Sequence, residues 1–590
     1  MQNEEDFSVL LVVPPFYAYG QPCLGTAILK SALSKKGISS KVFYANALYA
    51  NLVGLDHYRT IMSVVSPTEI YQEQIFAKKA HQGGVFAVSS KDDPDNFYAR
   101  YYSMFTNKKT TLTDQEFMDA EGQVDGFIDK FVEEVKRIKP KIVGFSSLYY
   151  QTNATLAMAK QLKKAMPEIV AVMGGNNCYP EMGEELAKYK SIDYIFDGEA
   201  DITFPDFCSK VLKESRLPDE KIIRCLPVQD LDQLDIPDYS DFMLQFAPEE
   251  RKDSLLYFET SRGCWWGAKH RCKFCGIADN VIDYRTKTAT KAALQICQMR
   301  EKYPEYKSYY ACDSVFPDSF FNAFFEALSS GNFDGTIFYQ IKPMLNFEQL
   351  KKMKESGIDT LGPGIESLST KHLALMKKGT TAAINIALLR NCKELNITAK
   401  WNHLVALPKD SGEDYKSLAL LFPLVQHLDP PVITPIYIQR FSPYFKNHEE
   451  HGISNLRPME GYSKAFPENL DLMKLAYQFD GEIDSHIRKT PELLIPFFTA
   501  IRKWYQRWST DPAELFLYRQ NGKILVKDTR DCAVDEITEI EENELDMLKY
   551  CHTPRKKEKI KDNVTNLRSR GYLIEIDDCL LSLVCGLFGV

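Results

Sequence analysis

Three cysteines in the middle of the chain have the spacing of ligands for a metal ion or a cluster. Cys264, Cys272 and Cys275 fall in the segment 261–276, directly after a short strand expected at 257–260. Thiolates at this spacing can hold a metal ion or an iron-sulfur cluster. A loop that follows a strand can wrap around such a group because its backbone is not committed to a sheet.

Three alternatives to a cluster compete for these thiols. Zinc normally takes a fourth nearby Cys or His, which His270 could supply. Three thiolates that leave one position open instead fit an iron-sulfur cluster that binds a substrate at its unique iron. A disulfide is disfavoured by the odd number of thiols and by a cytosolic setting, and buried structural cysteines are the remaining alternative. We therefore expect an iron-sulfur cluster here.

The composition argues against several classes of partner. A chain of 590 residues exceeds the roughly 250 to 300 that one hydrophobic core holds, so we expect three domains. The net charge of -8, without a basic block, argues against nucleic acid. No signal pattern precedes the apolar run 7–13, and no apolar run reaches the roughly 18 residues of a membrane-spanning helix. We expect a cytoplasmic protein with no nucleic-acid or membrane partner.

The first third of the chain alternates apolar strands with amphipathic helices, which predicts a parallel, doubly wound sheet of the α/β class. Ligands of such sheets lie at the carboxyl ends of the strands. The loop residues there are small or polar, although they could simply form tight turns. The segment 52–125 has a weak pattern and receives no role. The expected strands are 7–13, 40–44, 141–146, 169–175 and 192–198, and the candidate ligand residues are Ser146, Ser147, Leu148, Gly174, Gly175 and Glu199.

After the cysteines, short strands and helices alternate as in a partial βα barrel, whose functional groups lie at the carboxyl ends of its strands. For Asp313 and Lys342 a structural ion pair is an equally good interpretation. The expected strands are 307–313, 336–342, 360–367, 399–405 and 432–438, and the candidates by position are Asp313, Lys342, Glu366, Ser367 and Asn402.

The last third is expected to begin with a helical, aromatic region at 470–508. A strand at 524–528 and a helix at 541–550 follow, and a further helix begins at 553. Another helix ends at 571, and two strands close the chain at 572–576 and 580–584, which together suggests a small winged-helix-like unit. It lacks the basic recognition helix of a DNA-binding domain. A structural cap or a dimerisation unit is the alternative.

Two patterns carry a family resemblance that covers most of residues 8 to 445. The wide spacing Cys-x7-Cys-x2-Cys, with Trp265 and Trp266 after the first cysteine, resembles cobalamin-dependent radical S-adenosylmethionine (SAM) proteins that mature ribosomally made peptides. The glycine and serine loops of the first third resemble the cobalamin-binding domain of such enzymes. The motif Asp-x-His-x-x-Gly, which supplies a histidine ligand to cobalt in methionine-synthase-type domains, is absent here, so no histidine from that motif is expected below cobalt. Members of this family often have a glutamate at the position that Gln340 takes here.

The resemblance implies a domain plan and three cofactors: a 4Fe-4S cluster, SAM and cobalamin. Residues 1–235 would form a Rossmann-like cobalamin-binding domain, 236–450 a radical SAM partial barrel, and 451–590 a helical and winged-helix-like α+β domain. Ser146, Ser147 and Leu148 would lie beside the corrin, and Gly174, Gly175 and Glu199 beside its nucleotide tail. Cys264, Cys272 and Cys275 would hold the cluster, shielded by Phe274 and Gly276. Glu366 would pair with the ammonium of SAM, and Asp313, Lys342 and Ser367 are further cofactor contacts.

The implied activity is C-methylation of an unactivated carbon in a precursor peptide. The last domain looks like a leader-peptide recognition element, whose strand edge would take up an extended peptide. An electron donor such as flavodoxin or ferredoxin would be a second partner. The alternatives are a cobalamin enzyme that modifies a peptide or small molecule without methyl transfer, and a cluster-bearing sensor or binding protein without turnover.

Overall fold

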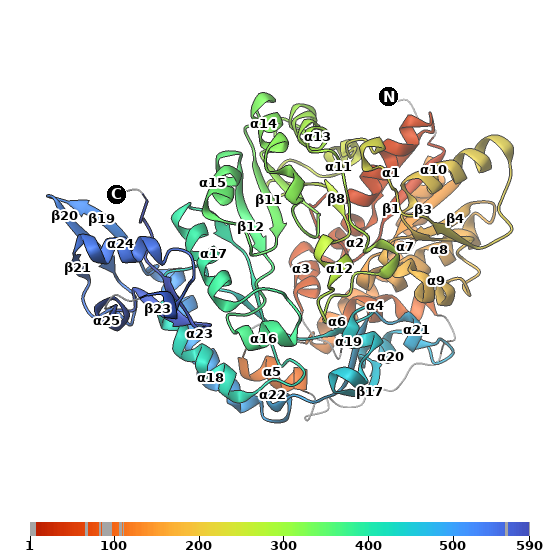
Figure 1. Ribbon diagram of the computed structural model, residues 1–590. Coiled ribbons are helices and arrows are strands. Elements are labelled where there is room, and N and C mark those ends of the chain that lie inside the picture. The colour runs from red at the N-terminus through yellow and green to blue at the C-terminus, as the bar shows by residue number, and fades with distance from the viewer. Residues whose placement is uncertain are drawn as a thin grey trace.

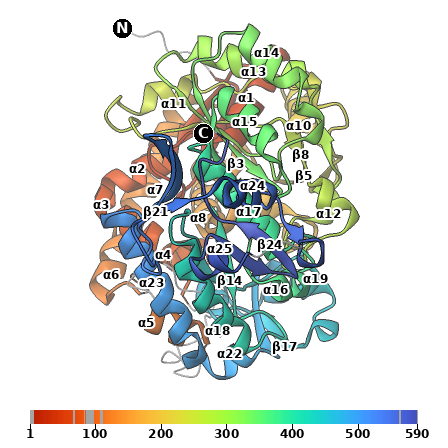
Figure 2. The same ribbon diagram turned by 60° about the vertical axis from the view of Figure 1, so that its left-hand side comes forward.

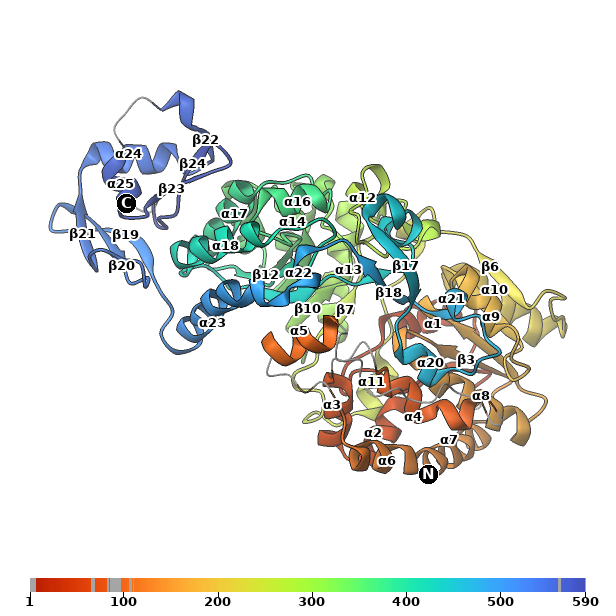
Figure 3. The same ribbon diagram turned by 90° about the horizontal axis from the view of Figure 1, so that it is seen from below.

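The computed structural model describes residues 7–64, 69–81, 84, 97–105, 109, 111–560 and 564–588. Two parallel sheets lie next to each other, and a small α+β unit follows at the C-terminal end (Figure 1). Figures 1 and 3 show the second sheet between the first sheet and this unit. The expected α/β fold class is confirmed. No helix in these described ranges is both long and apolar enough to cross a membrane.

The first sheet has six parallel strands in the order β2-β1-β3-β4-β5-β6. Its central strands are continuous apolar runs because helices cover both faces of the sheet. The strand order reverses between β1 and β3, which is where a doubly wound sheet opens a crevice for a ligand. The strands are β1 (Val9–Val13), β2 (Ser40–Tyr44), β3 (Ile142–Ser146), β4 (Val170–Gly174), β5 (Tyr194–Gly198) and β6 (Ile222–Cys225), of which β6 was not expected.

Helices cover this sheet in packed pairs. Helix α1 (Leu24–Lys35) packs against α10 (Ala200–Ser209), and α7 (Val124–Ile138) packs against α8 (Thr152–Ala165). The described part of the weakly patterned segment contributes further helices, and Glu73 from α4 accepts hydrogen bonds from the first amides of α8. These helices are α3 (Leu55–Ser63), α4 (Tyr71–Ala80), α5 (Phe97–Phe105) and α6 (Asp114–Gly122). Helix α2 (Ala45–Val53) precedes them and ends at the start of this segment.

The second sheet is the expected partial barrel. Five parallel strands run in the order β13-β12-β11-β10-β7, and a bridge between Glu366 and His403 leads to the parallel pair β14 and β15. The strands are β7 (Leu256–Phe258), β10 (Ser308–Ala311), β11 (Thr336–Ile341), β12 (Ile358–Pro363), β13 (Thr398–Ala399), β14 (Asn402–Val405) and β15 (Val432–Pro435). The outer helices include α13 (Ala289–Lys302), α14 (Ala323–Ser330), α15 (Phe347–Glu355), α16 (Thr370–Leu375), α17 (Ala382–Glu394) and α18 (Gly412–Leu421).

The region 470–508 is less helical than expected. Strand β18 (Gln478–Ile483) pairs antiparallel with β16 (Ile438–Gln439) and with β17 (Ile453–Pro458). One small sheet therefore spans position 450, where the sequence suggested a boundary. Only α23 (Ile495–Thr510) forms the long helix, and its Trp504 is buried and donates to the Leu428 carbonyl.

The C-terminal unit contains two small antiparallel sheets and two short helices, shown from another side in Figure 2. The first sheet was only partly foreseen: β19 (Leu515–Gln520) and β21 (Ile537–Ile540) flank β20 (Lys523–Asp528). The expected helix start at 553 is instead the short strand β22 (Arg555–Lys556). The remaining elements, α24 (Glu542–Tyr550), α25 (Thr565–Ser569) and the hairpin β23 (Leu573–Ile576) and β24 (Cys579–Ser582), follow the expected order.

Candidate functional site

The cysteine loop leaves the second sheet through β8 (Ser261–Arg262). Cys264 begins helix α12 (Trp265–Lys269), and its sulfur accepts a hydrogen bond from the Gly267 amide at 3.4 Å. The amide of Cys275 donates to the Cys272 carbonyl at 3.1 Å and closes the second turn. Gly263 has a φ of +78°, and a Cβ there would lie 2.4 Å from the Asp283 carbonyl oxygen, so this entry to the loop requires glycine.

All three thiols are free and partly exposed. Burial raises the pKa of Cys275, opposed by its hydrogen bond with the Ile277 backbone, and the neighbouring Cys272 and Cys264 raise it further. Nowhere in the part of the chain that the structure describes do three His, Cys, Asp or Glu side chains form a ready-made metal site. The donor set of three thiols on one short loop nevertheless has the chemistry of cluster ligands. His270 packs against Trp266, with ring centroids 4.3 Å apart and the ring planes tilted by 39°.

A cavity of about 470 Å³ opens beside this loop, and we call it the cysteine-loop cavity. The expected residues Phe274, Gly276, Glu366 and Asn402 line it. Of the other walls, Asn176 directly follows the paired glycines at the end of β4, and Thr434 and Tyr437 belong to the expected strand 432–438. The sequence did not indicate Tyr149, Tyr179, Gln439 and Tyr477. The hydroxyl of Tyr477 donates to the Gly276 carbonyl at 3.1 Å and so fixes the end of the cysteine loop.

A second cavity of about 330 Å³, the sheet-end cavity, lies at the carboxyl ends of β3, β4 and β5. Its walls include five of the six residues expected there: Ser146, Leu148, Gly174, Gly175 and Glu199. Ser147 differs, because its side chain is fully buried and accepts a hydrogen bond from Asn177 at 2.9 Å. The φ of Gly175 is +108°, and a Cβ there would meet the Ser147 carbonyl oxygen at 2.4 Å. Ser147 therefore shapes the turn.

A third cavity of about 470 Å³, the tyrosine cavity, lies between the loop after β3 and the segment 16–18. It shares Tyr149 and Tyr437 with the cysteine-loop cavity, and it shares Leu148 with the sheet-end cavity. The cysteine-loop cavity and the sheet-end cavity in turn share Asn176. Tyr149 has a φ of +44° and is 55% exposed. The three cavities therefore surround a single loop, and together they offer room for a large ligand that reaches from the first sheet to the cysteines.

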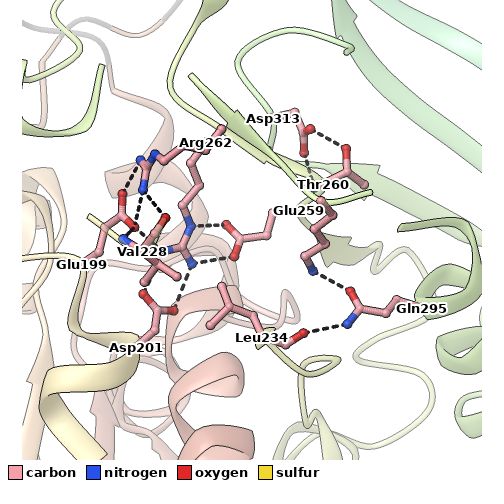
Figure 4. A network of polar contacts seen from close by, with 11 residues as sticks. Glu199, Asp201, Val228, Leu234, Glu259, Thr260, Arg262, Gln295 and Asp313 are labelled. Carbon is pink, nitrogen blue, oxygen red and sulfur yellow. Dashed lines mark hydrogen bonds and ion pairs between the residues drawn. The ribbon is translucent and has the colours of Figure 1, made fainter. Parts of the chain in front are cut away.

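A buried charge network ties the first sheet to the cysteine loop (Figure 4). Arg262 donates five hydrogen bonds of 2.6–3.0 Å to Glu259, Glu199 and Asp201. Arg285 donates two more to Glu199. Burial alone would raise the pKa of Glu199, but the hydrogen bonds from Arg285 and the charge of Arg262 hold it below its usual value. Glu199 thus borders the sheet-end cavity, but its carboxylate is already paired with Arg262 and Arg285. Arg262 was not among the residues expected from the sequence, although its position two residues before Cys264 marked it.

Two residues that were expected to contact a cofactor, Asp313 and Ser367, instead make polar contacts with other residues of the protein. Asp313 accepts hydrogen bonds from the amide and hydroxyl of Thr260 and from the hydroxyl of Ser261, at 2.6–2.7 Å. Burial raises the pKa of Asp313 to about 6. The buried hydroxyl of Ser367 lies 3.3 Å from His403 Nε2. Neither side chain lines the cavities described above, so both hold the barrel together. Asp313 does so through hydrogen bonds from Thr260 and Ser261 and not through the ion pair that was the alternative interpretation.

Lys342 and Glu366 do lie beside the cysteine loop, together with a lysine that was not expected from the sequence. Lys342 Nζ stands 3.9 Å from the ring centroid of Trp266 and donates to the Lys378 carbonyl at 2.7 Å. Burial and the neighbouring Lys378 lower the pKa of Lys342 to about 8. Glu366 has a φ of +60°, and its carboxylate lies 3.4 Å from Lys378 Nζ. No spacing in the sequence pointed to Lys378.

Comparison with known proteins supports the assignment of the central domain. Residues 258–422 match the radical SAM superfamily. An uncharacterized methyltransferase from Pyrococcus horikoshii is 23% identical over 303 residues, which cover 48% of this chain and 64% of that protein. This chain therefore spans less than two thirds of the relative's length.

Two solved structures share the fold over most of the chain. One is OxsB, a cobalamin-dependent SAM radical enzyme with aqua-cobalamin and SAM bound (TM-score 0.55, 14% identity, 85% of this chain and 67% of that chain). The other is TsrM, a radical SAM methyltransferase from Kitasatospora setae with tryptophan substrate and a SAM analogue bound (TM-score 0.55, 12% identity, 84% and 89%). At these identities the similarity establishes the fold.

Proposed function

We propose that this protein is a cobalamin-dependent radical SAM methyltransferase. The proposal depends above all on the junction of the cavities: the sheet-end cavity and the cysteine-loop cavity share Asn176, so ligands in the two would lie next to each other. The match of residues 258–422 to the radical SAM superfamily supports the cluster and SAM, and the fold shared with OxsB and TsrM supports cobalamin. When bound, the cluster and SAM supply a radical that removes hydrogen, and cobalamin supplies a methyl group.

The residues of this chain would bind and orient these groups. Cys264, Cys272 and Cys275 would hold the cluster and leave one iron open for SAM. Glu366 lines the cysteine-loop cavity, where its carboxylate could pair with the ammonium of SAM. The glycines at the end of β4 let the backbone approach the cobalamin tail closely. The sheets that enclose the cavities would exclude water and hold the reacting atoms in line.

The proposed substrate is a ribosomally made peptide, methylated on an unactivated carbon. The C-terminal unit supports this, because β21 pairs only with β20 among the described strands and is therefore an edge strand, and its first residue, Ile537, is exposed. An extended peptide could add to such an edge. An external one-electron donor such as flavodoxin or ferredoxin would reduce the cluster. The similarity to OxsB and TsrM, at 14% and 12% identity, supports the fold and leaves the reaction open, so a cobalamin enzyme that modifies its substrate without methyl transfer is the second candidate.

The test is anaerobic reconstitution with iron, sulfide and cobalamin, followed by absorbance spectra and a SAM turnover assay. Wild type should bind both cofactors and release 5'-deoxyadenosine together with S-adenosylhomocysteine. Cys272→Ala should release neither product, whereas Cys532→Ala, a partly exposed free cysteine in the C-terminal unit, should behave as wild type. A cluster without cobalamin refutes the cobalamin site. Release of 5'-deoxyadenosine without S-adenosylhomocysteine favours the second candidate, and a product one methylene heavier confirms methylation.

A further inference from the structure

Two buried lysines stand behind the cysteine loop. Lys342 follows β11 and Lys378 follows α16, and the two residues are 8% and 5% exposed. Lys342 Nζ lies 3.9 Å from the ring centroid of Trp266, the second residue after Cys264. Lys378 Nζ lies 5.6 Å from the ring centroid of Phe274, the residue before Cys275. Both ammonium groups therefore face aromatic residues of the loop that carries the thiols.

The local charges do not balance without the thiols. Glu366 is the carboxylate next to Lys378, with 3.4 Å between Oε1 and Nζ. Lys342 has no ion pair with a carboxylate among the residues that the structure describes, and its hydrogen bond goes to the Lys378 carbonyl. A buried ammonium is unfavourable unless an opposite charge compensates it. Cys272, Cys264 and Glu366 all lie near enough to Lys342 to favour its charged form, so thiolates at Cys272 and Cys264 would supply the missing opposite charge.

The backbone holds this arrangement tightly. Gly379 follows Lys378 with a φ of +69°, and a Cβ there would lie 2.0 Å from the Trp266 ring. The indole is therefore in direct contact with the backbone after Lys378 on one side and with the Lys342 ammonium on another. The distance from the lysines to the cysteine loop is thus fixed by packing, and also by a hydrogen bond from the Lys273 amide to the Met376 carbonyl at 3.1 Å.

We propose that Lys342 and Lys378 supply the positive charge that compensates the thiolates of the cysteine loop and so set the reduction potential of the cluster. The inference rests on the proposed function, because it requires the cluster on Cys264, Cys272 and Cys275. Reduction adds one negative charge to the cluster, and a buried cation nearby stabilises the reduced form. Net charge and solvent exposure around a cluster are among the factors that set its potential.

The experiment is a redox titration of the reconstituted protein without SAM, followed by electron paramagnetic resonance of the reduced cluster. Lys342→Met and Lys378→Met keep most of the side-chain volume and remove the charge. Each should lower the equilibrium constant for reduction at least tenfold, which is about 59 mV for one electron. Lys342→Arg should retain the wild-type potential. The matched control is Lys377→Met, because Lys377 is the exposed neighbour of Lys378.

The outcomes distinguish this inference from a role of the two lysines in SAM binding and from failure of the proposed function. Full clusters with an unchanged potential in both methionine variants overturn it. A loss of SAM affinity with an unchanged potential also overturns it and assigns these lysines to the carboxylate of SAM. If Lys342→Met and Lys342→Gln both fold but lose the cluster while Lys342→Arg keeps it, the need for charge is supported. A wild type without a cluster refutes the proposed function and this inference together.

Discussion

Removal of Arg262 should destabilise the contact between the first sheet and the cysteine loop. In Arg262→Gln, Arg285 still compensates Glu199, but Asp201 and Glu259 lose the guanidinium that donates hydrogen bonds to them. Their side chains are only 10% and 13% exposed, so they would remain as buried, uncompensated charges. Breaking a buried ion pair by removing one partner costs about 3–5 kcal/mol. We expect a loss of that size in the free energy of unfolding.

Urea denaturation followed by tryptophan fluorescence measures this loss, since Trp265 and Trp266 lie close to the network in the chain. The control is Arg300→Gln, which removes an ion pair whose carboxylate partner, Asp334, is 57% exposed and can be hydrated, so it should cost at most about 1 kcal/mol. If Arg262→Gln loses no more stability than this control, the buried network does not hold the two parts together. Adding Asp201→Asn and Glu259→Gln to Arg262→Gln should restore part of the stability, because no unpaired charge then remains.

The pH dependence of the same variant has a definite sign. Burial would raise the pKa of Asp201, but the charge and hydrogen bonds of Arg262 outweigh it and lower the pKa. A carboxylate with a lowered folded-state pKa stabilises the protein above its unfolded pKa of about 3.9, and this contribution is lost as the pH falls through the folded value. The difference between wild type and Arg262→Gln should therefore be greatest near neutral pH and shrink in acid.

Three other substitutions test the site. Gly25 lines the sheet-end cavity, and no heavy atom lies within 4 Å of an added Cβ, so Gly25→Leu should fold normally yet bind less cobalamin in equilibrium dialysis. Unchanged binding would show that the nucleotide tail of cobalamin does not occupy this cavity. Gly379→Ala should displace Trp266 and lower the iron content of the reconstituted protein. The control Gly522→Ala, at a similar φ of +78° with open space around it, should not lower it. Equal iron content in the two variants would show that the contact between Gly379 and Trp266 does not position the cysteine loop. Burial raises the pKa of Asp313 to about 6, so ionisation of this group destabilises the folded protein as the pH rises from about 4 to 6. Relative to wild type, Asp313→Asn should gain about 2 kcal/mol in the free energy of unfolding between pH 4 and 7 in urea denaturation, and a constant difference would show that Asp313 does not titrate there.

Much of the fold could be predicted because both sheets are built from strands with strong local signals. Strand β1 is an uninterrupted apolar run, and the rule that ligands bind at strand ends placed Ser146, Leu148 and Gly175 at a cavity. Strand β18 was missed because its six residues lie within a long aromatic segment whose overall pattern is helical. In the C-terminal unit, β21 was missed because it has only four residues, two of which are exposed.

The site itself was only partly predictable, because contacts depend on orientation and on partners far away in the sequence. Asp313 and Ser367 lie near the ends of strands as expected, but their side chains turn into the barrel wall. Arg262 acquires its role from Glu199, which lies 63 residues earlier. Lys378 becomes significant only because the chain after α16 folds back onto Trp266.

The loop after β3 gives neighbouring ligands a common wall. Tyr149 borders both the tyrosine cavity and the cysteine-loop cavity, and Leu148 borders the sheet-end cavity. A ligand that shifts this loop on one side alters the shape of the space on the other, so the two binding equilibria are coupled. Such coupling is reciprocal: the factor by which the first ligand changes the affinity for the second is the factor by which the second changes the affinity for the first.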